Sequence, residues 1–285
     1  MTDSPATQTS VARFYERALR EFTPGCCSPQ KPVPILATDY TPEQLSSLPS
    51  DAVANSFGCG NPLAFAQVES GQTLLDLGSG AGIDLIIAAE TVGPKGKVIG
   101  VDLSAEMVER ARANVERAGH ANVEIHVGAM EVLPLADASV DWVVSNCVIN
   151  LAPDKPRVFA EIARVLKPGG QMLVSDIIAH DLPEWVLSNA DLYAACISGA
   201  LTEADYLGAA TSAGLADVKI VDRLVYDGAM IGALIVHQLP VSVSELGPRL
   251  GFGNDTGAFM NFVLQELDGK IESVKVAGRK MDGLR

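Results

Sequence analysis

Asp76-Leu77-Gly78-Ser79-Gly80-Ala81-Gly82 is the stretch of sequence that decides the fold. A short apolar run, Thr73 to Leu77, precedes the glycines and is typical of a buried strand. The stretch that follows, Ile83 to Val92, predicts a helix that ends at Gly93-Pro94. Glycine has no Cβ, so it permits a tight turn and lets a ligand approach the backbone closely. A strand, a glycine-rich turn and a helix in this order predict a nucleotide-binding loop.

Acids around this loop favour a cationic ligand over a dinucleotide. A dinucleotide fingerprint needs a glycine where Ile83 stands. Asp102 ends the second predicted strand, where a carboxylate can accept hydrogen bonds from ribose hydroxyls. Asp76 and Asp84 add negative charge that suits an amino group and a sulfonium better than a pyrophosphate. We therefore expect S-adenosylmethionine rather than NAD, bound by Asp76, Gly78, Gly80, Gly82, Asp102, Leu103, Met130 and Asn146.

Strands and helices alternate from residue 72 onward, which predicts a doubly wound, mostly parallel α/β sheet. In such a sheet, ligands bind beyond the carboxyl ends of the strands. Further strands are predicted over Lys97–Val101, Val123–Val127, Val140–Ser145 and Gln171–Ser175, the last after a loop at Lys167-Pro168-Gly169-Gly170. Further helices are predicted after the N-cap Ser104 to about Ala118, over Lys155–Leu166 and over Thr202–Ala213.

Three segments are expected along the chain. Residues 1–70 form an N-terminal helical and loop segment with helices over Val11–Phe22 and near Pro42–Leu48. Residues 71–225 form the cofactor domain with a substrate lid, and residues 226–285 form a small appendage of unclear role. The tail predicts an antiparallel pair of strands, Val218–Leu224 and Ile271–Ala277, with a helix over Thr256–Leu267 between them.

Composition limits the possible partners and the compartment. The formal net charge of -14 argues against nucleic acid and against anionic membrane surfaces, because both attract clustered Lys and Arg. The N-terminus carries no signal-peptide pattern, and no window reaches the roughly 18 apolar residues of a membrane span. We therefore expect a cytoplasmic protein with reduced thiols. The odd total of 5 cysteines gives no indication of a disulfide framework.

The cysteines lie in unusual places. Cys26 and Cys27 are adjacent, while Cys59, Cys147 and Cys196 stand beside Gly, Asn or Ser. Cys59 precedes the first strand, Cys147 follows the fourth, and Cys196 lies in the segment that usually builds a substrate lid. A zinc site needs short Cys-x-x-Cys pairs, and the chain has none. Each thiol alone can also be read as a small buried hydrophobe. Together they indicate soft-element chemistry beside a cofactor.

Five segments resemble the arsenite S-adenosylmethionine methyltransferases, and the resemblance covers roughly residues 10 to 225. These segments are Ser56–Pro62, Asp76–Gly82, Ser145–Leu151, Pro153–Lys155 and Cys196–Leu201. The resemblance implies a class I methyltransferase fold and arsenic held by Cys147, Cys196 and Cys59. The family's N-terminal cysteine corresponds to Cys26 or Cys27. Longer members carry extra cysteine pairs in a C-terminal region, whereas this chain has no cysteine after Cys196.

The chemistry agrees with that resemblance. Arsenic(III) is soft and selects thiolate ligands, and three thiolates leave its lone pair free to face a sulfonium methyl group. The nucleophile carries no proton, so no general base is needed, and alignment of the two reactants supplies the catalysis. The resemblance implies methylation of arsenite and methylarsenite, as thiol conjugates, for arsenic detoxification. It also implies that Cys26 or Cys27 relays a disulfide to glutathione or thioredoxin.

Two other hypotheses fit parts of the pattern. A small-molecule C- or O-methyltransferase would use the same loop, but it would be indifferent to cysteine loss and would need a base that the motifs do not provide. A metalloid-binding or sensing module would keep the fold without turnover. The complete glycine loop and Asp102 disfavour this third hypothesis.

Overall fold

The computed structural model describes residues 11, 40–56, 58, 60–189, 192–193, 196–237 and 247–282. The predicted helix over Val11–Phe22, apart from Val11 itself, lies outside these residues. Cys26, Cys27 and Cys59 lie outside them as well. No helix in the described part of the chain is long and apolar enough to cross a membrane.

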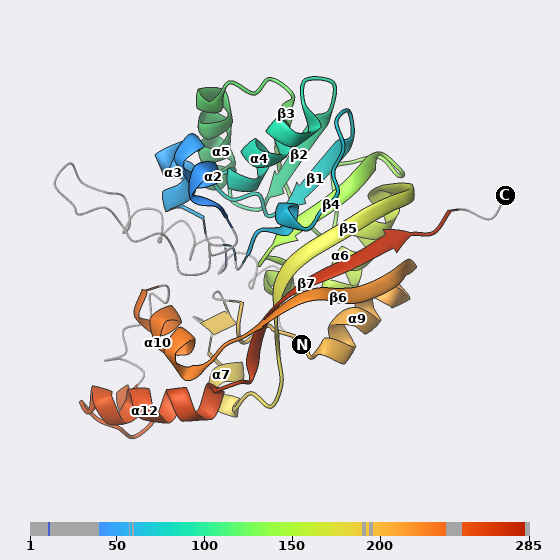
Figure 1. Ribbon diagram of the computed structural model, residues 1–285. Coiled ribbons are helices and arrows are strands. Elements are labelled where there is room, and N and C mark those ends of the chain that lie inside the picture. Colours follow the sequence, from blue (N-terminus) through green and yellow to red (C-terminus); the bar gives the residue numbers. More distant parts are fainter. Residues whose placement is uncertain are drawn as a thin grey trace.

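The described residues form a seven-stranded sheet in the order β3-β2-β1-β4-β5-β7-β6 (Figure 1). The first five strands along the chain run parallel to one another, and β7 is antiparallel to both β5 and β6. The doubly wound α/β sheet predicted from the sequence is therefore confirmed. The strands are β1 (Thr73–Leu77), β2 (Lys97–Asp102), β3 (Val123–Val127), β4 (Val140–Asn146), β5 (Leu166–Ala179), β6 (Leu215–Val225) and β7 (Ile271–Lys280).

Helices cover both faces of the sheet (Figure 1). On one face, α4 (Ile83–Val92) and α5 (Ala105–Ala118) enclose a core together with the N-terminal α2 (Pro42–Ser47) and α3 (Ser50–Ala54). On the other face, α6 (Lys155–Val165) and α9 (Glu203–Ser212) enclose a second core. The remaining helices are η1 (Pro62–Ala64), η2 (Ile149–Leu151), α7 (Glu184–Leu187), α10 (Gly228–His237) and α12 (Thr256–Leu267).

A third apolar cluster lies past the carboxyl end of β4. It joins α10 and α12 to α7, and it contains Cys147 and Cys196. Within it, Phe252 packs at a tilt against Phe259 and Phe262, with ring centroids 5.7 and 5.1 Å apart. Figure 1 shows α7, α10 and α12 gathered at one end of the sheet, away from the helices that cover its faces. This arrangement gives the two cysteines a largely apolar environment.

Local sequence signals explain several element ends. Ser104 caps α5 by accepting a hydrogen bond from the Met107 backbone N–H at 3.3 Å, and Gly119 ends this helix in the left-handed region. Thr202 caps α9 in the same way, by accepting from the Asp205 backbone N–H. The helix over Thr256–Leu267 has the predicted bounds.

Two expectations about the sheet need correction. The Lys167–Gly170 stretch is not a loop before the fifth strand, because it lies within β5 as an irregularity between the pairs Val140–Leu166 and Trp142–Gln171. Residues 226–285 were expected to form an appendage, but β7 lies inside the sheet between β5 and β6. Its side chains Val274 and Val276 belong to the main core, so the tail completes the central sheet.

Candidate active site

The glycine loop follows β1 and bends through left-handed backbone conformations. Gly78, Gly80 and Gly82 have φ angles of 72°, 50° and 93°, a region that residues with a Cβ rarely adopt. The Gly78 N–H donates to the Val101 carbonyl at 2.8 Å, which anchors the loop on β2. A Cβ on Gly78 would lie 2.5 Å from the Val148 side chain. At this position glycine is required by both the turn and the close packing.

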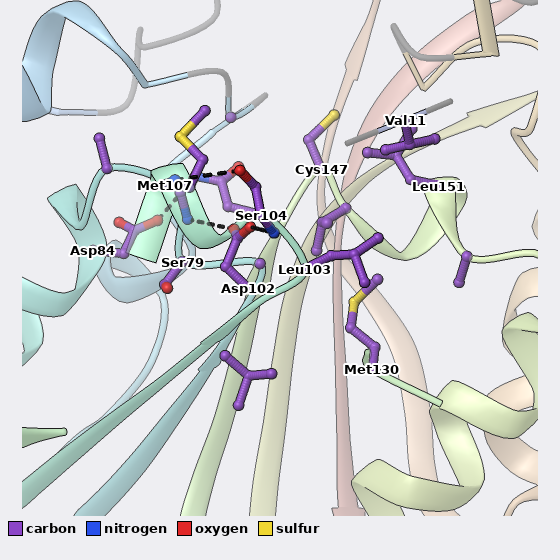
Figure 2. A pocket seen from close by; sticks show the side chains of 18 of the residues that line it. Val11, Ser79, Asp84, Asp102, Leu103, Ser104, Met107, Met130, Cys147 and Leu151 are labelled. Atoms are coloured by element: carbon purple, nitrogen blue, oxygen red, sulfur yellow. Dashed lines mark hydrogen bonds between the residues drawn. The ribbon is translucent and has the colours of Figure 1, made fainter. Parts of the chain in front are cut away.

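Asp102, at the carboxyl end of β2, is braced by backbone donors. Its Oδ2 accepts the Gly80 N–H at 2.9 Å, and its Oδ1 accepts the Ser104 N–H at 2.9 Å. Burial raises the pKa of Asp102, and these hydrogen bonds oppose that rise. Figure 2 shows Asp102 next to Ser104, along the wall that also carries Met107. Because each carboxylate oxygen has two lone pairs, the braced side chain can still accept a ligand's hydroxyls.

Two more acids are buried close to the loop. Burial, followed by repulsion from Asp84 and Asp102, holds the pKa of Asp76 well above its usual range. Burial also raises the pKa of Asp84, although Asp84 accepts hydrogen bonds from Tyr40 Oη at 2.7 Å and from Asn146 Nδ2 at 3.1 Å. A cationic ligand would favour the ionised form of all three carboxyls. The cluster therefore fits a ligand that carries an amino group and a sulfonium.

Sequence reasoning missed Tyr40, whose side chain closes this cluster. Tyr40 lies just before α2 and is 5 % exposed, and its hydroxyl links the N-terminal segment to the start of α4 through Asp84. Asn146 makes a similar link, because its Nδ2 donates to the Gly60 carbonyl at 2.6 Å. No pattern in the sequence around Tyr40 predicts a contact 44 residues away.

A cavity opens above the glycine loop and encloses about 980 Å³, counting the space open at its mouth. Figure 2 shows Asp84 and Met107 on one side of it and Cys147 and Leu151 on the other. Of the residues expected to bind cofactor, those lining the cavity are Gly78, Gly80, Asp102, Leu103, Met130 and Asn146. The two others, Asp76 and Gly82, are not among its described lining residues.

The structure brings two of the five cysteines together. Cys147 follows β4 directly, lines the cavity and is 7 % exposed, and its N–H donates to the Ser175 carbonyl at 2.7 Å. Cys196 is 3 % exposed, and its Sγ donates to the Cys147 carbonyl at 2.7 Å. Both residues have positive φ angles, 60° and 64°. Among the described residues no group of three or more His, Cys, Asp or Glu side chains could hold a metal ion.

Comparison with known proteins agrees with this fold and cavity. A family model described as a methyltransferase domain matches residues 68–224. The chain therefore belongs to the methyltransferases, and S-adenosylmethionine is the cofactor of this class.

Individual relatives narrow the class further. Arsenite methyltransferases from Halobacterium salinarum and Aquipseudomonas alcaligenes are 43% and 37% identical over 70% and 75% of this chain. The solved arsenic(III) S-adenosylmethionine methyltransferase from Chlamydomonas reinhardtii is 31% identical, with a TM-score of 0.65 over 85% of this chain and 74% of its own. Within the methyltransferases, this chain belongs to the arsenite methyltransferase family. It spans only 51% and 63% of the length of the first two relatives.

Proposed function

We propose that this protein transfers methyl groups from S-adenosylmethionine to trivalent arsenic held by cysteine thiolates. Arsenite and methylarsenite are the proposed acceptors, and arsenic detoxification is the proposed role. One observation carries the proposal: Cys147 lines the cavity that also contains the glycine loop and Asp102. Cys196, hydrogen-bonded to the Cys147 carbonyl, lies next to Cys147 and is proposed to supply a second thiol.

Different residues of the chain would bind different parts of the cofactor. Gly80 leaves open space for the ligand against the backbone, and Gly78 lets the loop turn beneath Val148. Asp102 would accept hydrogen bonds from the ribose hydroxyls. Leu103 and Met130 offer apolar surface to the adenine, and Asp84 draws the positive charge of the other end into the cavity. When bound, S-adenosylmethionine supplies a methyl group on a positively charged sulfur.

The thiolates bind and orient the arsenic substrate. Arsenic(III) prefers thiolate sulfur, and its lone pair forms the new bond to the methyl carbon while the carbon–sulfur bond of the donor breaks. Arsenic is thereby formally oxidised by two electrons. Two thiols must return these electrons by forming a disulfide, which glutathione or thioredoxin then reduces. No side chain has to remove a proton in this sequence of steps.

Three further cysteines complete the proposal, and all lie outside the described residues. Cys59 is proposed as the third arsenic ligand. Cys26 or Cys27 is proposed to deliver arsenic from thiol conjugates and to form the disulfide. Gly58 and Gly60, which flank Cys59 in the sequence, are both described. Gly60 accepts the Asn146 hydrogen bond, and a Cβ on Gly58 would fall 2.3 Å from that same amide.

A methyl-transfer assay tests the proposal. Radiolabelled S-adenosylmethionine, arsenite and glutathione are incubated with wild type, Cys147→Ser and Cys196→Ser, and methylarsenicals are separated by chromatography. We expect both variants to lose methylarsenical formation while S-adenosylmethionine still binds, as measured by calorimetry. Full activity of Cys147→Ser would contradict the arsenic site. Label transfer to an organic acceptor that is unaffected by either variant would instead identify a small-molecule methyltransferase.

A further inference from the structure

Both described cysteines sit on strained turns. A left-handed conformation at a residue with a Cβ costs free energy, and it persists only where the surroundings enforce it. Cys147 begins the turn that runs through η2 to Leu151, and Cys196 begins the turn that runs to Leu201. We call these the Cys147 turn and the Cys196 turn. The residues that enforce their shapes are not part of the cofactor site.

Asn150 holds the Cys147 turn against β5. Its side chain is fully buried, and its Nδ2 donates to Asp176 Oδ1 at 2.8 Å and to the Ile177 carbonyl at 2.6 Å. Asp176 is fixed in turn, because it accepts the Ile177 N–H at 2.9 Å and Tyr206 Oη at 3.1 Å. The amide of Asn150 is therefore attached to a hydrogen-bonded point near the carboxyl end of β5.

The same residue supports the Cys196 turn through its backbone. Gly199 approaches the Asn150 carbonyl so closely that a Cβ on Gly199 would lie 2.5 Å from that oxygen. The Cys196 turn is also tied by Tyr193, whose carbonyl accepts the Cys196 N–H at 3.0 Å and whose hydroxyl donates to the Leu151 carbonyl at 3.2 Å. Asn150 is thus in contact with both turns, through its side chain and its carbonyl.

Asn150 also has a buried acceptor atom that destabilises the fold, and packing alone does not explain its presence. Its Oδ1 atom is buried and has no hydrogen-bond partner among the described residues. A buried acceptor without a partner destabilises a fold, so such a group needs another reason to be present. Fixing the separation of two thiols is such a reason, because a single arsenic atom bridges them only at one spacing.

We propose that Asn150 and Gly199 are positioning residues that set the spacing between Cys147 and Cys196 for one arsenic(III) centre. The inference rests on the proposed function, since it assigns a role within the same site. Asn150 acts through its two side-chain hydrogen bonds. Gly199 acts through the absence of a Cβ, which lets the Cys196 turn lie directly on the Asn150 carbonyl.

Thiol bridging tests the spacing without arsenic. In a background with Cys26, Cys27 and Cys59 changed to Ser, dibromobimane can become fluorescent only by bridging Cys147 and Cys196. We expect Asn150→Ala, which loses two hydrogen bonds, to slow this bridging by about tenfold. Gly199→Ala should slow it to a similar extent, because its Cβ would clash with the Asn150 carbonyl. Asn122→Ala is the matched control. Like Asn150, it makes two hydrogen bonds through its Nδ2. They go to the Gly93 and Gly96 carbonyls at the opposite end of the sheet.

Arsenite affinity then tests the role in the site. In the otherwise native chain, Asn150→Ala should weaken arsenite binding by about tenfold and S-adenosylmethionine binding by less than about twofold. In a Cys196→Ser background the same change should weaken residual arsenite binding by less than about twofold. An equal effect in both backgrounds would mean that Asn150 does not act through the cysteine pair.

The outcomes separate this inference from the proposed function. If wild type binds no arsenite but Asn150→Ala still slows bridging, the proposed function is wrong and the spacing role stands. If folded Asn150→Ala and Gly199→Ala variants bridge as fast as Asn122→Ala, the spacing role is wrong. Should Asn150→Ala not fold, Gly199→Ala decides, because it leaves the side chain of Asn150 in place and adds only a Cβ against the Asn150 carbonyl. Bridging at the control rate by this variant would then refute the idea.

Discussion

Changing Asp176 to Asn should reverse part of the pH dependence of stability. Asp176 lies near the carboxyl end of β5 and is fully buried. Burial raises its pKa to about 6 from an ordinary 3.8, although hydrogen bonds from Ile177, Tyr206 and Asn150 oppose that rise. Asparagine has the same shape and stays neutral, so the variant removes the titration and keeps the packing.

The sign and the size of this effect on the free energy of unfolding follow from the linkage between folding and proton binding. A carboxyl whose pKa is higher in the folded state contributes stability that is fully present below the unfolded pKa of 3.8. That contribution is lost as the pH rises through the folded pKa of about 6. A difference of about two pKa units corresponds to about 3 kcal/mol, most of which is lost between about pH 4 and pH 7. Relative to wild type, Asp176→Asn should therefore gain about 2 kcal/mol of stability over this range.

Urea unfolding of both proteins at about pH 4 and pH 7.5 measures the difference. Asp217→Asn is a useful control of opposite sign, because the pKa of Asp217 is lowered by its hydrogen bond and ion pair with Arg279 on the surface. The stability that Asp217 contributes is present at neutral pH and is lost on acidification. A constant difference between wild type and Asp176→Asn across the pH range would refute the reasoning about burial at this position.

Three other changes give separate tests. Gly78→Ala should weaken S-adenosylmethionine binding at least about tenfold in calorimetry, because a Cβ would clash with Val148 and the φ angle of 72° is strained; unchanged affinity would remove the loop from the cofactor site. Tyr40→Phe removes a hydrogen bond that lowers the pKa of Asp84. The loss of cofactor affinity on acidification should then begin at higher pH, and an unshifted profile would exclude Asp84 from binding. Ala138→Gly should stabilise the fold by about 1 kcal/mol in urea unfolding, because exposed Ala138 has a φ angle of 51°; a destabilised variant would contradict this account.

Local signals carried most of the fold prediction. The apolar run before the glycine loop, the caps Ser104 and Thr202, and the terminator Gly119 each act within a few residues of their element. Interactions of this range can be recognised in a sequence, and the corresponding strands and helices have nearly the expected bounds. Asp102 ends the next strand after the glycine loop, and parallel strands end at the same edge of the sheet. This position therefore predicted that Asp102 lies beside the loop, where both line the cavity.

The sequence predicted only part of the long-range pairing. The antiparallel pair of Val218–Leu224 with Ile271–Ala277 is confirmed, but the pairing of β7 with β5 was not predicted. The position of β7 between β5 and β6 depends on ladders such as Val174–Val276, which join residues far apart in the chain. An alternating strand pattern shows that a strand exists and which face it buries, but not which neighbour it pairs with. The same limit explains why Tyr40 went unnoticed and why Lys167–Gly170 was expected to be a loop. A Lys-Pro-Gly-Gly stretch has strong turn residues, and only the sheet around it shows that it continues a strand.

For the cysteines, the sequence predicted one feature of the site and missed another. Their neighbours in the sequence indicated that Cys147 and Cys196 belong to one site, and the contact between Cys196 Sγ and the Cys147 carbonyl agrees with that expectation. The sequence did not predict which residues fix the two cysteines in position. Their position depends on a buried acid in β5 and on a glycine that contacts a carbonyl 49 residues earlier. The acids of the cofactor loop and the apolar cluster around the thiols occupy neighbouring parts of the same region. Cys147 lines the cavity and belongs to the apolar cluster, so the two regions meet at the carboxyl end of β4.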